Sequence, residues 1–459
     1  MRLLPPSLLL PLAVVAGLAA ACSDESGGKT SPGSPERIVL ITLDTLRFDA
    51  MPGIHADKPS MPHTWEWAQG GRIFERYYSA TSTTQPSHAT LFTGLHPWQH
   101  GVSHNGAVLA DGLTTVAERL HAAGWRTAAA VASFPLYSTF GFNQGFDEYR
   151  ETFNKGETEQ WSGHEVTAEG GFFGSGDLIL KESLDLLDHL GGKKQFFWFH
   201  FFDAHAPYGD RVEGYADLNP TELIRRIRQS GGPPGPLTRA ARGAYDKDVR
   251  QMDRELRDLF ARLEADGIPT HVIVVSDHGE SFGESGSLGH GKRLTPEQIH
   301  VPLIVKSPRV KPGVVSTPVG SIDVNATLLS LAGLDGAPAG SRDLTSDAPL
   351  EDHPVIGMRR TYTKYSEERT DGSIHKITKN DNRFYIVEDG QLYTGNKDLV
   401  SHEDDELPIS DTERTARYSE LFGGFEQQLL TTGSEELQDA ETLEKLKTLG
   451  YVDDEDQGQ

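Results

Sequence analysis

Short apolar runs rich in β-branched and aromatic residues recur along the first 335 residues, and stretches with helical periodicity lie between them. The runs have the length of strands that are buried on both faces of a sheet. Strands that alternate with helices indicate an α/β fold, in which a mostly parallel central sheet is flanked by helices. The predicted strands are 37–43, 127–132, 195–202, 271–276 and 301–305, and the predicted helices are 113–123, 178–190, 245–265 and 321–334.

The pattern changes after residue 335. Residues 335–347 are rich in Gly, Pro, Ser and Asp, which is typical of a linker. Shorter strand patterns follow, with Asp389-Gly390 as a hairpin turn. We therefore expect an α/β domain over 37–335, a smaller α+β subdomain over 336–450 and a disordered acidic tail over 451–459. The short strands are predicted at 354–358, 374–378, 383–388 and 391–393, and helices at 411–430 and near Leu443.

The first 21 residues have the pattern of a signal peptide: Arg2, an apolar stretch over 8–15, and three alanines at 19–21. Cys22, the only cysteine of the chain, follows at once and resembles the lipidated cysteine of a bacterial lipobox. Residues 22–36 would then be a flexible tether. We expect an exported, membrane-anchored lipoprotein that faces the periplasm or the cell surface. The alternative is an ordinary cleaved signal with an unrelated cysteine beside it.

Composition narrows the chemistry further. The formal net charge of -24 argues against nucleic acid as a partner, because phosphate backbones bind basic surfaces. An anionic substrate must therefore be attracted by local positive charge or by a metal ion. Without a cysteine after Cys22, the domain cannot use internal disulfides or thiolate metal ligands. The sequence does not indicate the oligomeric state.

Polar residues follow several predicted strands directly. Asp44 comes after 37–43, His205 lies just beyond 195–202, and Asp277 and His278 follow 271–276, with His290 a short loop further on. Ligands of open α/β sheets bind beyond the carboxyl ends of the strands. An Asp next to a His at such an end suits zinc or manganese. Taken singly, Asp44 could cap a turn, and His205 and His290 could be structural.

The segment 81–94, TSTTQPSHATLFTG, resembles the nucleophile turn of the sulfatase family, with Thr84 in place of the usual cysteine. The stretch GLHPWQHGV at 94–102, the segment DAHAPY at 203–208, the block SDHGE at 276–280 and the segment HGK at 290–292 follow in the order of that family. The resemblance covers about residues 37–335 and implies the fold of the sulfatase and alkaline phosphatase superfamily.

The resemblance also implies roles for individual residues. Asp44, Asp277 and His278 would hold a divalent metal ion, with Thr84 against the ion as ligand and nucleophile. His205 and Lys292 would stabilise the substrate oxygens or protonate the leaving group, and His88 and His290 would contact the substrate. In an alternative, His205 and His290 bind a second metal. Thr84 could instead serve only as a helix cap.

Four departures from the sulfatase pattern alter the expected reaction. Thr84 cannot become formylglycine, His88 replaces an arginine, Thr45 replaces an aspartate, and His278 stands where many sulfatases have asparagine. A histidine ligand favours zinc or manganese, with calcium or magnesium as the other options. We therefore predict an extracytoplasmic hydrolase of a phosphate, phosphodiester or phosphonate ester, acting on a small molecule, glycan or lipid.

Three alternatives remain. The first is a sulfuric ester hydrolase that works without formylglycine. The second is a phosphoethanolamine-type transferase, because residues 276–291 are similar to the corresponding stretch of those enzymes. The third is a catalytically dead, lipid-anchored binding protein.

Overall fold

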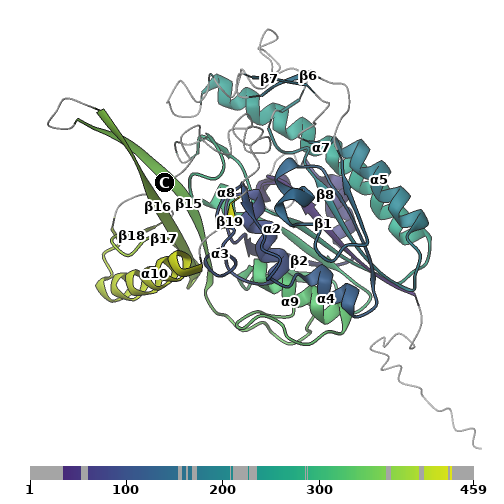
Figure 1. Ribbon diagram of the computed structural model, residues 1–459. Helices are drawn as coiled ribbons and strands as arrows, with labels where there is room; N and C mark the ends of the chain where they lie inside the picture. Colours follow the sequence, from purple (N-terminus) through teal and green to yellow (C-terminus); the bar gives the residue numbers. More distant parts are fainter. Residues whose placement is uncertain are drawn as a thin grey trace, which may run out of the picture.

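The computed structural model describes most of the chain (Figure 1). The predicted signal peptide, Cys22, most of the tether, the helix near Leu443 and the acidic tail lie outside the described residues. The described residues are 35–52, 60–152, 158–161, 164–167, 173–206, 208–209, 226, 235–284, 286, 288–368, 374–402, 408–432 and 435–436.

The central sheet has nine strands, and β1 (Glu36–Leu43) lies in its middle. β8 (Lys194–Phe201) and β9 (Thr270–Ser276) pair with β1 on either side, both parallel to it. β4 (Arg126–Val131) and β5 (Glu148–Glu151) continue the parallel half beyond β8. The predicted strands 37–43, 127–132, 195–202 and 271–276 therefore match observed strands within a residue or two.

The other half of the sheet is mixed. β12 (His300–Lys306) runs antiparallel to both of its neighbours, β9 and β2 (Arg72–Tyr78). β2 was not among the predicted strands, because two arginines and a glutamate interrupt its apolar pattern. β13 (Gly313–Val315) and β14 (Val319–Gly320) run parallel to β2. β12 is thus the one reversed strand of this sheet among the described residues, and the expectation of a mostly parallel sheet is confirmed.

Helices cover both faces of this sheet (Figure 1). One face carries α1, α5 and α7, whose apolar side chains join β1 and β8 residues in one core cluster. The other face carries α2, α4 and α9, which form a second core cluster against the opposite side of the same strands. The bounds are α1 Pro62–Ala68, α2 Thr84–Thr93, α3 Pro97–His100, α4 Val116–Ala122, α5 Gly176–His189, α7 Pro236–Ala265, α8 Pro296–Ile299 and α9 Ser321–Ala332.

Several short elements decorate the α/β domain. Two small antiparallel pairs are formed by β6 with β7 and by β10 with β11, and β3 pairs with β19 from near the other end of the described chain. Their bounds, with those of the 3-10 turns, are β3 Ala107–Val108, β6 Thr158–Trp161, β7 His164–Thr167, β10 Ser281–Phe282, β11 Leu288–Gly289, β19 Glu435–Glu436, η1 Phe48–Ala50, η2 Phe134–Leu136 and η3 Ser138–Phe140.

The C-terminal part is a four-stranded antiparallel sheet of β15 (Val355–Glu368), β16 (Ile374–Glu388), β17 (Gln391–Gly395) and β18 (Val400–His402), with α10 (Thr412–Thr432) beside it. The two strands predicted at 374–378 and 383–388 are one continuous strand, because pairing with β15 carries it across the polar stretch between them. Asp389 and Gly390 both have positive φ, 50° and 77°, as the predicted hairpin turn requires.

This subdomain is bonded to the α/β domain just before the segment 81–94. The Tyr385 hydroxyl donates to the Ser79 carbonyl at 2.6 Å, and the Met358 N–H donates to the Ala80 carbonyl at 2.9 Å. Trp98 of α3 is part of the subdomain's apolar core and stacks on Phe425 at 4.1 Å. The stretch 335–347, expected to be a linker, packs against the α/β domain through buried Leu344.

Within the part of the chain that the structure describes, no helix combines the length and the apolar character needed to cross a membrane.

Candidate active site

The two predicted aspartates lie side by side because their strands are neighbours in register. Leu43 at the end of β1 pairs with Ser276 at the end of β9, so Asp44 and Asp277 leave the sheet at the same level. Both side chains are completely buried. The Asp44 N–H donates to the Phe201 carbonyl at 2.9 Å, which ties the end of β1 to the end of β8 as well.

Thr45, in the loop after β1, has an unusual backbone conformation. Its φ of 54° is an unusual conformation for a β-branched residue and is typical of a backbone that its surroundings force into place. In this conformation the Thr45 N–H donates to Asp277 Oδ1 at 3.2 Å, and the Tyr245 hydroxyl donates to the Thr45 carbonyl at 3.1 Å. The backbone of Thr45 thus helps to fix the carboxylate of Asp277.

His278 turns its Nε2 atom toward both aspartates. Its Nδ1 lies 3.0 Å from the carbonyl of Gly279, which can only accept, so Nδ1 carries the hydrogen and Nε2 keeps a lone pair. Nε2 lies 3.8 Å from Asp44 Oδ1 and 3.6 Å from Asp277 Oδ2. The next residue, Gly279, has a φ that is not positive, and glycine is required there because an added Cβ would lie 2.1 Å from the Glu297 carbonyl oxygen.

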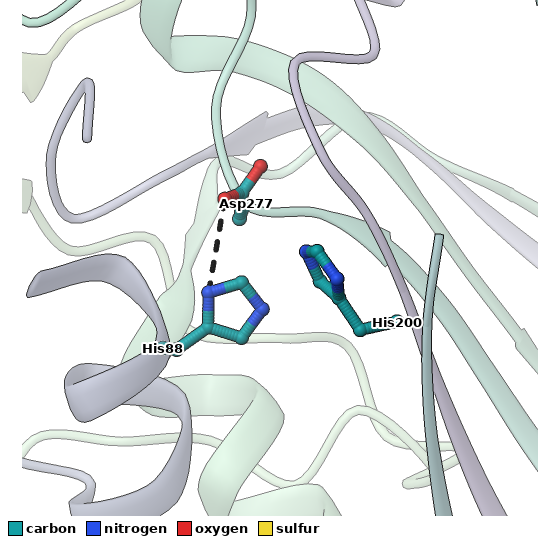
Figure 2. Close-up of side chains that lie close together, drawn as sticks. All are labelled: His88, His200 and Asp277. Carbon is teal, nitrogen blue, oxygen red and sulfur yellow. Dashed lines mark ion pairs between the residues drawn. The ribbon is translucent and has the colours of Figure 1, made fainter. Parts of the chain in front are cut away.

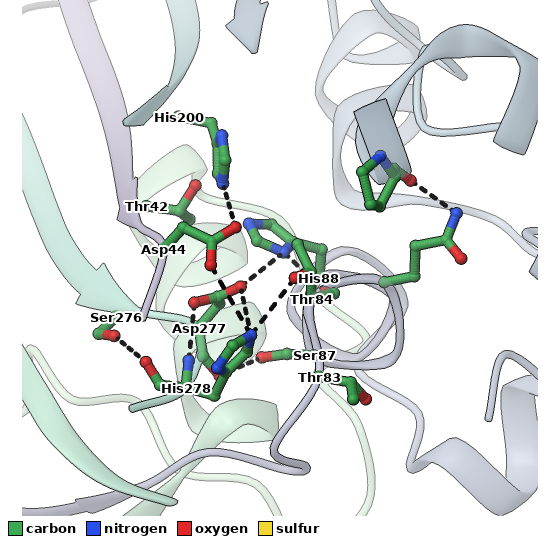
Figure 3. A network of polar contacts seen from close by, with 12 residues as sticks. Thr42, Asp44, Thr83, Thr84, Ser87, His88, His200, Ser276, Asp277 and His278 are labelled. Carbon is green, nitrogen blue, oxygen red and sulfur yellow. Dashed lines mark hydrogen bonds and ion pairs between the residues drawn. The ribbon is translucent and has the colours of Figure 1, made fainter. Parts of the chain in front are cut away.

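Thr84 is the first residue of α2 and faces the same cluster (Figure 3). Its hydroxyl oxygen lies 3.3 Å from His278 Nε2. The N-cap of the helix is Thr83, so the hydroxyl of Thr84 does not serve as the cap. Ser87 in the first turns of α2 donates to the Asp277 carbonyl at 2.7 Å and so joins the helix to the end of β9.

Two further histidines, His88 and His200, lie near Asp277 (Figure 2). His88 Nδ1 is 2.9 Å from the Thr84 carbonyl and 3.7 Å from Asp277 Oδ2. His200 Nε2 is 3.4 Å from Asp44 Oδ2. The predicted role of His88 as a substrate contact stays a prediction. His200 was not among the predicted residues, although it is a polar residue within an apolar and aromatic run of the strand.

The buried carboxylates of this cluster would be stabilised by a bound cation. Asp44 Oδ1 and Oδ2, Asp277 Oδ2 and the Nε2 atoms of His88 and His200 have no hydrogen-bond partner among the described residues. Burial raises the pKa of Asp44 to about 7, and burial together with the charge of Asp44 raises the pKa of Asp277 to about 8. Two buried carboxylates with three oxygens that lack a hydrogen-bond donor are costly unless a positive charge compensates them.

The donor set fits a divalent metal ion. Asp44, Asp277 and His278 form one group of converging ligand atoms, and His88, His200 and Asp277 form another. Two carboxylate oxygens, one imidazole nitrogen and the nearby Thr84 hydroxyl are a mixed O and N set, which suits zinc or manganese. The four predicted ligands therefore lie close together, although they come from three places: the end of β1, the end of β9 and the start of α2.

The remaining predicted residues lie at a more open edge. His290 packs on His278 with ring centroids 4.4 Å apart, and on His205 at 5.0 Å. His290 Nδ1 lies 3.1 Å from Glu280 Oε1, and the Tyr208 hydroxyl donates to Glu280 Oε2 at 2.7 Å. Among the described residues, His205 and His290 do not join a third ligand in a metal-binding group, so a second metal between them stays a prediction.

Lys292 lies in the loop after β11 and its side chain is exposed. The neighbouring residue Gly291 has a φ of 79° and would place a Cβ 2.9 Å from the Thr83 side chain. This close approach brings the Lys292 loop to the start of α2, beside Thr84. A role of Lys292 with the substrate stays a prediction.

Comparisons with known proteins identify the family of the chain. The sequence model of the sulfatase family matches residues 36–334. The choline-sulfatase of Rhizobium meliloti strain 1021 is 24% identical over 66% of this chain and 68% of its own length. An uncharacterized sulfatase of Escherichia coli strain K12 is 36% identical over 64% of this chain and 68% of its own length. The crystal structure of a phosphonate monoester hydrolase from Silicibacter pomeroyi superposes with a TM-score of 0.58 at 19% identity, covering 86% of this chain and 94% of that one.

The likeness to that structure shows that the two proteins share an α/β fold. The chain belongs to the sulfatase family, whose members are metal-dependent hydrolases of esters.

Proposed function

We propose that this chain is a metal-dependent hydrolase of phosphate or phosphonate esters that uses Thr84 as its nucleophile. The observation that carries the proposal is the position of the Thr84 hydroxyl, 3.3 Å from His278 Nε2 and at the mouth of the Asp44–Asp277–His278 group. The only cysteine of the chain is Cys22, so a formylglycine nucleophile cannot form at position 84.

Asp44, Asp277 and His278 would hold the ion, which lowers the pKa of a nearby hydroxyl and withdraws charge from substrate oxygens when it is bound. The Thr84 hydroxyl loses its proton to solvent and its oxygen attacks phosphorus, the bond from phosphorus to the leaving oxygen breaks, and a phosphothreonine forms. Water then attacks phosphorus, the bond from phosphorus to the Thr84 oxygen breaks, and the proton that the water loses restores the Thr84 hydroxyl. The leaving oxygen takes its proton from His290, because burial lowers the pKa of His205 to about 3 and leaves that ring neutral, and Lys292 neutralises the transferred group.

Two substitutions favour phosphorus over sulfur as the reacting centre. An aldehyde hydrate releases its bound sulfate by collapsing to the aldehyde, and Thr84 has no second hydroxyl for that route. A phosphothreonine can instead be opened by attack of water on phosphorus. His88 replaces the arginine that supports the formylglycine in sulfatases, and it offers no bidentate fork. The likeness of the fold to a phosphonate monoester hydrolase is compatible with this choice.

A second candidate is the hydrolysis of sulfate esters by the same threonine. The match to the sulfatase family and the similarity to a choline-sulfatase favour it. The two candidates share every residue of the site and differ only in the central atom of the substrate.

The test is a comparison of nitrophenyl phosphate, bis-nitrophenyl phosphate, nitrophenyl phenylphosphonate and nitrophenyl sulfate with the metal-loaded protein. We expect the phosphorus esters to have the larger kcat/KM, and a covalent adduct of phosphate mass on the peptide that contains Thr84. Faster turnover of the sulfate ester would replace the first candidate with the second. Turnover that persists in Thr84→Ala would contradict both.

We further propose that Cys22 carries a lipid anchor, so that the substrate is an extracytoplasmic ester. The support is the position of the single cysteine directly after a signal-like stretch. Cys22→Ser should release the protein from the membrane fraction of an expressing bacterium and abolish labelling by a fatty-acid analogue. An unchanged distribution would argue for an ordinary cleaved signal.

A further inference from the structure

His200 occupies a position that the proposed reaction does not use. It is the seventh residue of β8, and its side chain is completely buried on the face of the sheet that carries α2. Trp198, two residues earlier on the same face, packs against His88 with ring centroids 5.4 Å apart and donates its indole N–H to Thr42 at 2.9 Å. Polar side chains are rare in such a place without a function, because each must be satisfied away from water.

The hydrogen bonds of His200 determine which ring nitrogen carries its hydrogen. The backbone N–H of Ala132, at the end of β4, donates to His200 Nδ1 at 3.4 Å. Nδ1 is therefore the acceptor, and Nε2 carries the hydrogen in the neutral ring. His200 thus presents one N–H, and that N–H faces Asp44 Oδ2 at 3.4 Å.

Asp44 needs such a donor. Its Oδ1 faces His278 Nε2, where the cation would lie, while its Oδ2 has no hydrogen-bond partner among the described residues. The separation from His200 is slightly longer than an ideal hydrogen bond, and a small rotation of the carboxylate would close it. Carboxylates that bind metals are commonly held by such an outer partner, which fixes the oxygen that faces the ion.

We propose that His200 is a positioning residue of the metal site, which donates its Nε2–H to Asp44 Oδ2 and thereby aims Oδ1 at the cation. The inference rests on the proposed metal site but not on the identity of the ester. His88 has the corresponding place on the other side, because its Nδ1–H donates to the Thr84 carbonyl and lies near Asp277 Oδ2. Two imidazoles, each bonded to the backbone, then lie behind the ligands.

The same residues could be taken as ligands of a second ion, because His88, His200 and Asp277 converge. The hydrogen on His200 Nε2 argues against this, since a metal needs the lone pair of that nitrogen. Asp277 also has one oxygen to offer, because Oδ1 already accepts from the N–H groups of Thr45 and His278 at 3.2 and 2.7 Å. Sharing Oδ2 between two ions would leave the second with His88 as its only other ligand in this group.

The test measures metal binding without substrate. Metal-stripped full-length protein is titrated with Co²⁺ against a chelator of known affinity, and the visible spectrum of bound Co²⁺ reports the ligand geometry. We expect His200→Phe to raise the Kd for Co²⁺ about 10- to 100-fold and to alter the spectrum. His200→Gln, whose amide can donate from a similar distance, should restore most of the affinity.

His100→Phe is the matched control. His100 is also buried, and it bonds to Thr90 and to the N–H of Val102 instead of to a metal ligand. We expect this variant to lower the melting temperature as much as His200→Phe does while leaving the Kd for Co²⁺ unchanged. The two variants together separate metal positioning from general packing.

Three results would overturn the inference. The first is an unchanged Kd in His200→Phe, and the second is an equal loss of affinity in His100→Phe. The third is the loss of one of two bound ions in His200→Phe with the affinity of the other unaltered, which would make His200 a ligand. If Co²⁺ binding responds as expected but no phosphorus ester is hydrolysed, the proposed function fails and the role of His200 stands.

Discussion

The site has two regions that differ in how they are built. The floor consists of Asp44, Thr84, His88, His200, Asp277 and His278, all with exposed fractions of 0%. The rim consists of His205, Glu280, His290 and Lys292, where the His290 side chain is 13% exposed and Lys292 lies at the surface. The floor comes from strand ends and the start of α2, whereas the rim comes from loops after β8, β9 and β11.

This difference assigns the chemistry to separate parts of the chain. Residues at strand ends are held by the register of the sheet, which suits groups that must keep a fixed geometry around an ion. Loop residues can change without disturbing the sheet, which suits contacts that distinguish one ester from another. We therefore expect floor variants to alter metal binding and kcat together, and rim variants to alter kcat/KM with the metal retained.

The largest effect in the floor is expected from substitution of its proposed nucleophile. Thr84→Ala should lower kcat by at least about a thousandfold, because the attacking oxygen is absent. The metal content, measured by elemental analysis, should fall less than it does in Asp277→Ala. Thr84→Ser, which keeps the hydroxyl, should retain measurable turnover. Equal activity in Thr84→Ala and Thr84→Ser would remove the hydroxyl from the mechanism.

The paired aspartates of the floor should make the metal-free protein sensitive to pH. The unfolded chain releases both protons near pH 4, but the folded state holds them until about pH 7 for Asp44 and about pH 8 for Asp277. Between those limits the folded state binds more protons than the unfolded chain, so its stability falls as the pH rises. Melting curves in a chelator at pH 5 and pH 8 should show this loss.

Asp277→Asn sharpens that experiment, because it removes one titrating carboxyl and its repulsion of Asp44. We expect the melting temperature of this variant to vary less with pH in the chelator, while its affinity for Mn²⁺ falls. Saturating Mn²⁺ should make the melting temperature of the unsubstituted protein nearly independent of pH, and it should have no such effect on the variant. A chelated protein whose stability is constant from pH 5 to pH 8 would contradict the pKa values given above.

The rim is tested by its cation. Lys292→Met should lower kcat/KM by about tenfold to a hundredfold, because a positive charge near the transferred group is lost. Since Lys292 is exposed, the effect should shrink as salt is added. Metal content should not change. A loss of bound metal in Lys292→Met would show that the rim also contributes to metal binding and would contradict the separation of the two regions.

The smallest effect is expected at the support of the rim. Tyr208→Phe removes the hydroxyl that donates to Glu280 Oε2 at 2.7 Å. The free energy of unfolding should fall by about 1.5–3 kcal/mol, because a hydrogen bond to a charged group is lost. Turnover should fall by about tenfold or less, with the Kd for Co²⁺ unaltered. A change in Co²⁺ affinity larger than that of His200→Phe would reverse the assignment of the two regions.

Some of this arrangement could be predicted from the sequence, and the reason is the sheet. Asp44, Asp277 and His278 follow strands that are apolar throughout, so both the strands and the residues beyond them are recognisable. β2 escaped prediction because its charged residues break the apolar pattern, although pairing with β12 makes it a strand. A reversal such as that of β12 depends on the whole fold and leaves no local signal.

The surroundings of His200, in contrast, could not be predicted from the sequence. It stands inside a predicted strand, and the sequence alone cannot say that this position faces α2 and Asp44 instead of a hydrophobic layer. The roles of Gly279 and Thr45 were equally hidden, because each depends on a segment distant in the chain: the carbonyl of Glu297 for Gly279, and the carboxylate of Asp277 for Thr45. Contacts of that kind appear only once the strands are assembled.

The bond from Tyr385 to the Ser79 carbonyl joins two residues that are 306 positions apart in the chain. A ribosome therefore completes the residues that lead into α2 long before it makes the residue that braces them. The consequence concerns timing: this part of the chain acquires its support only after the C-terminal sheet has been synthesised and folded.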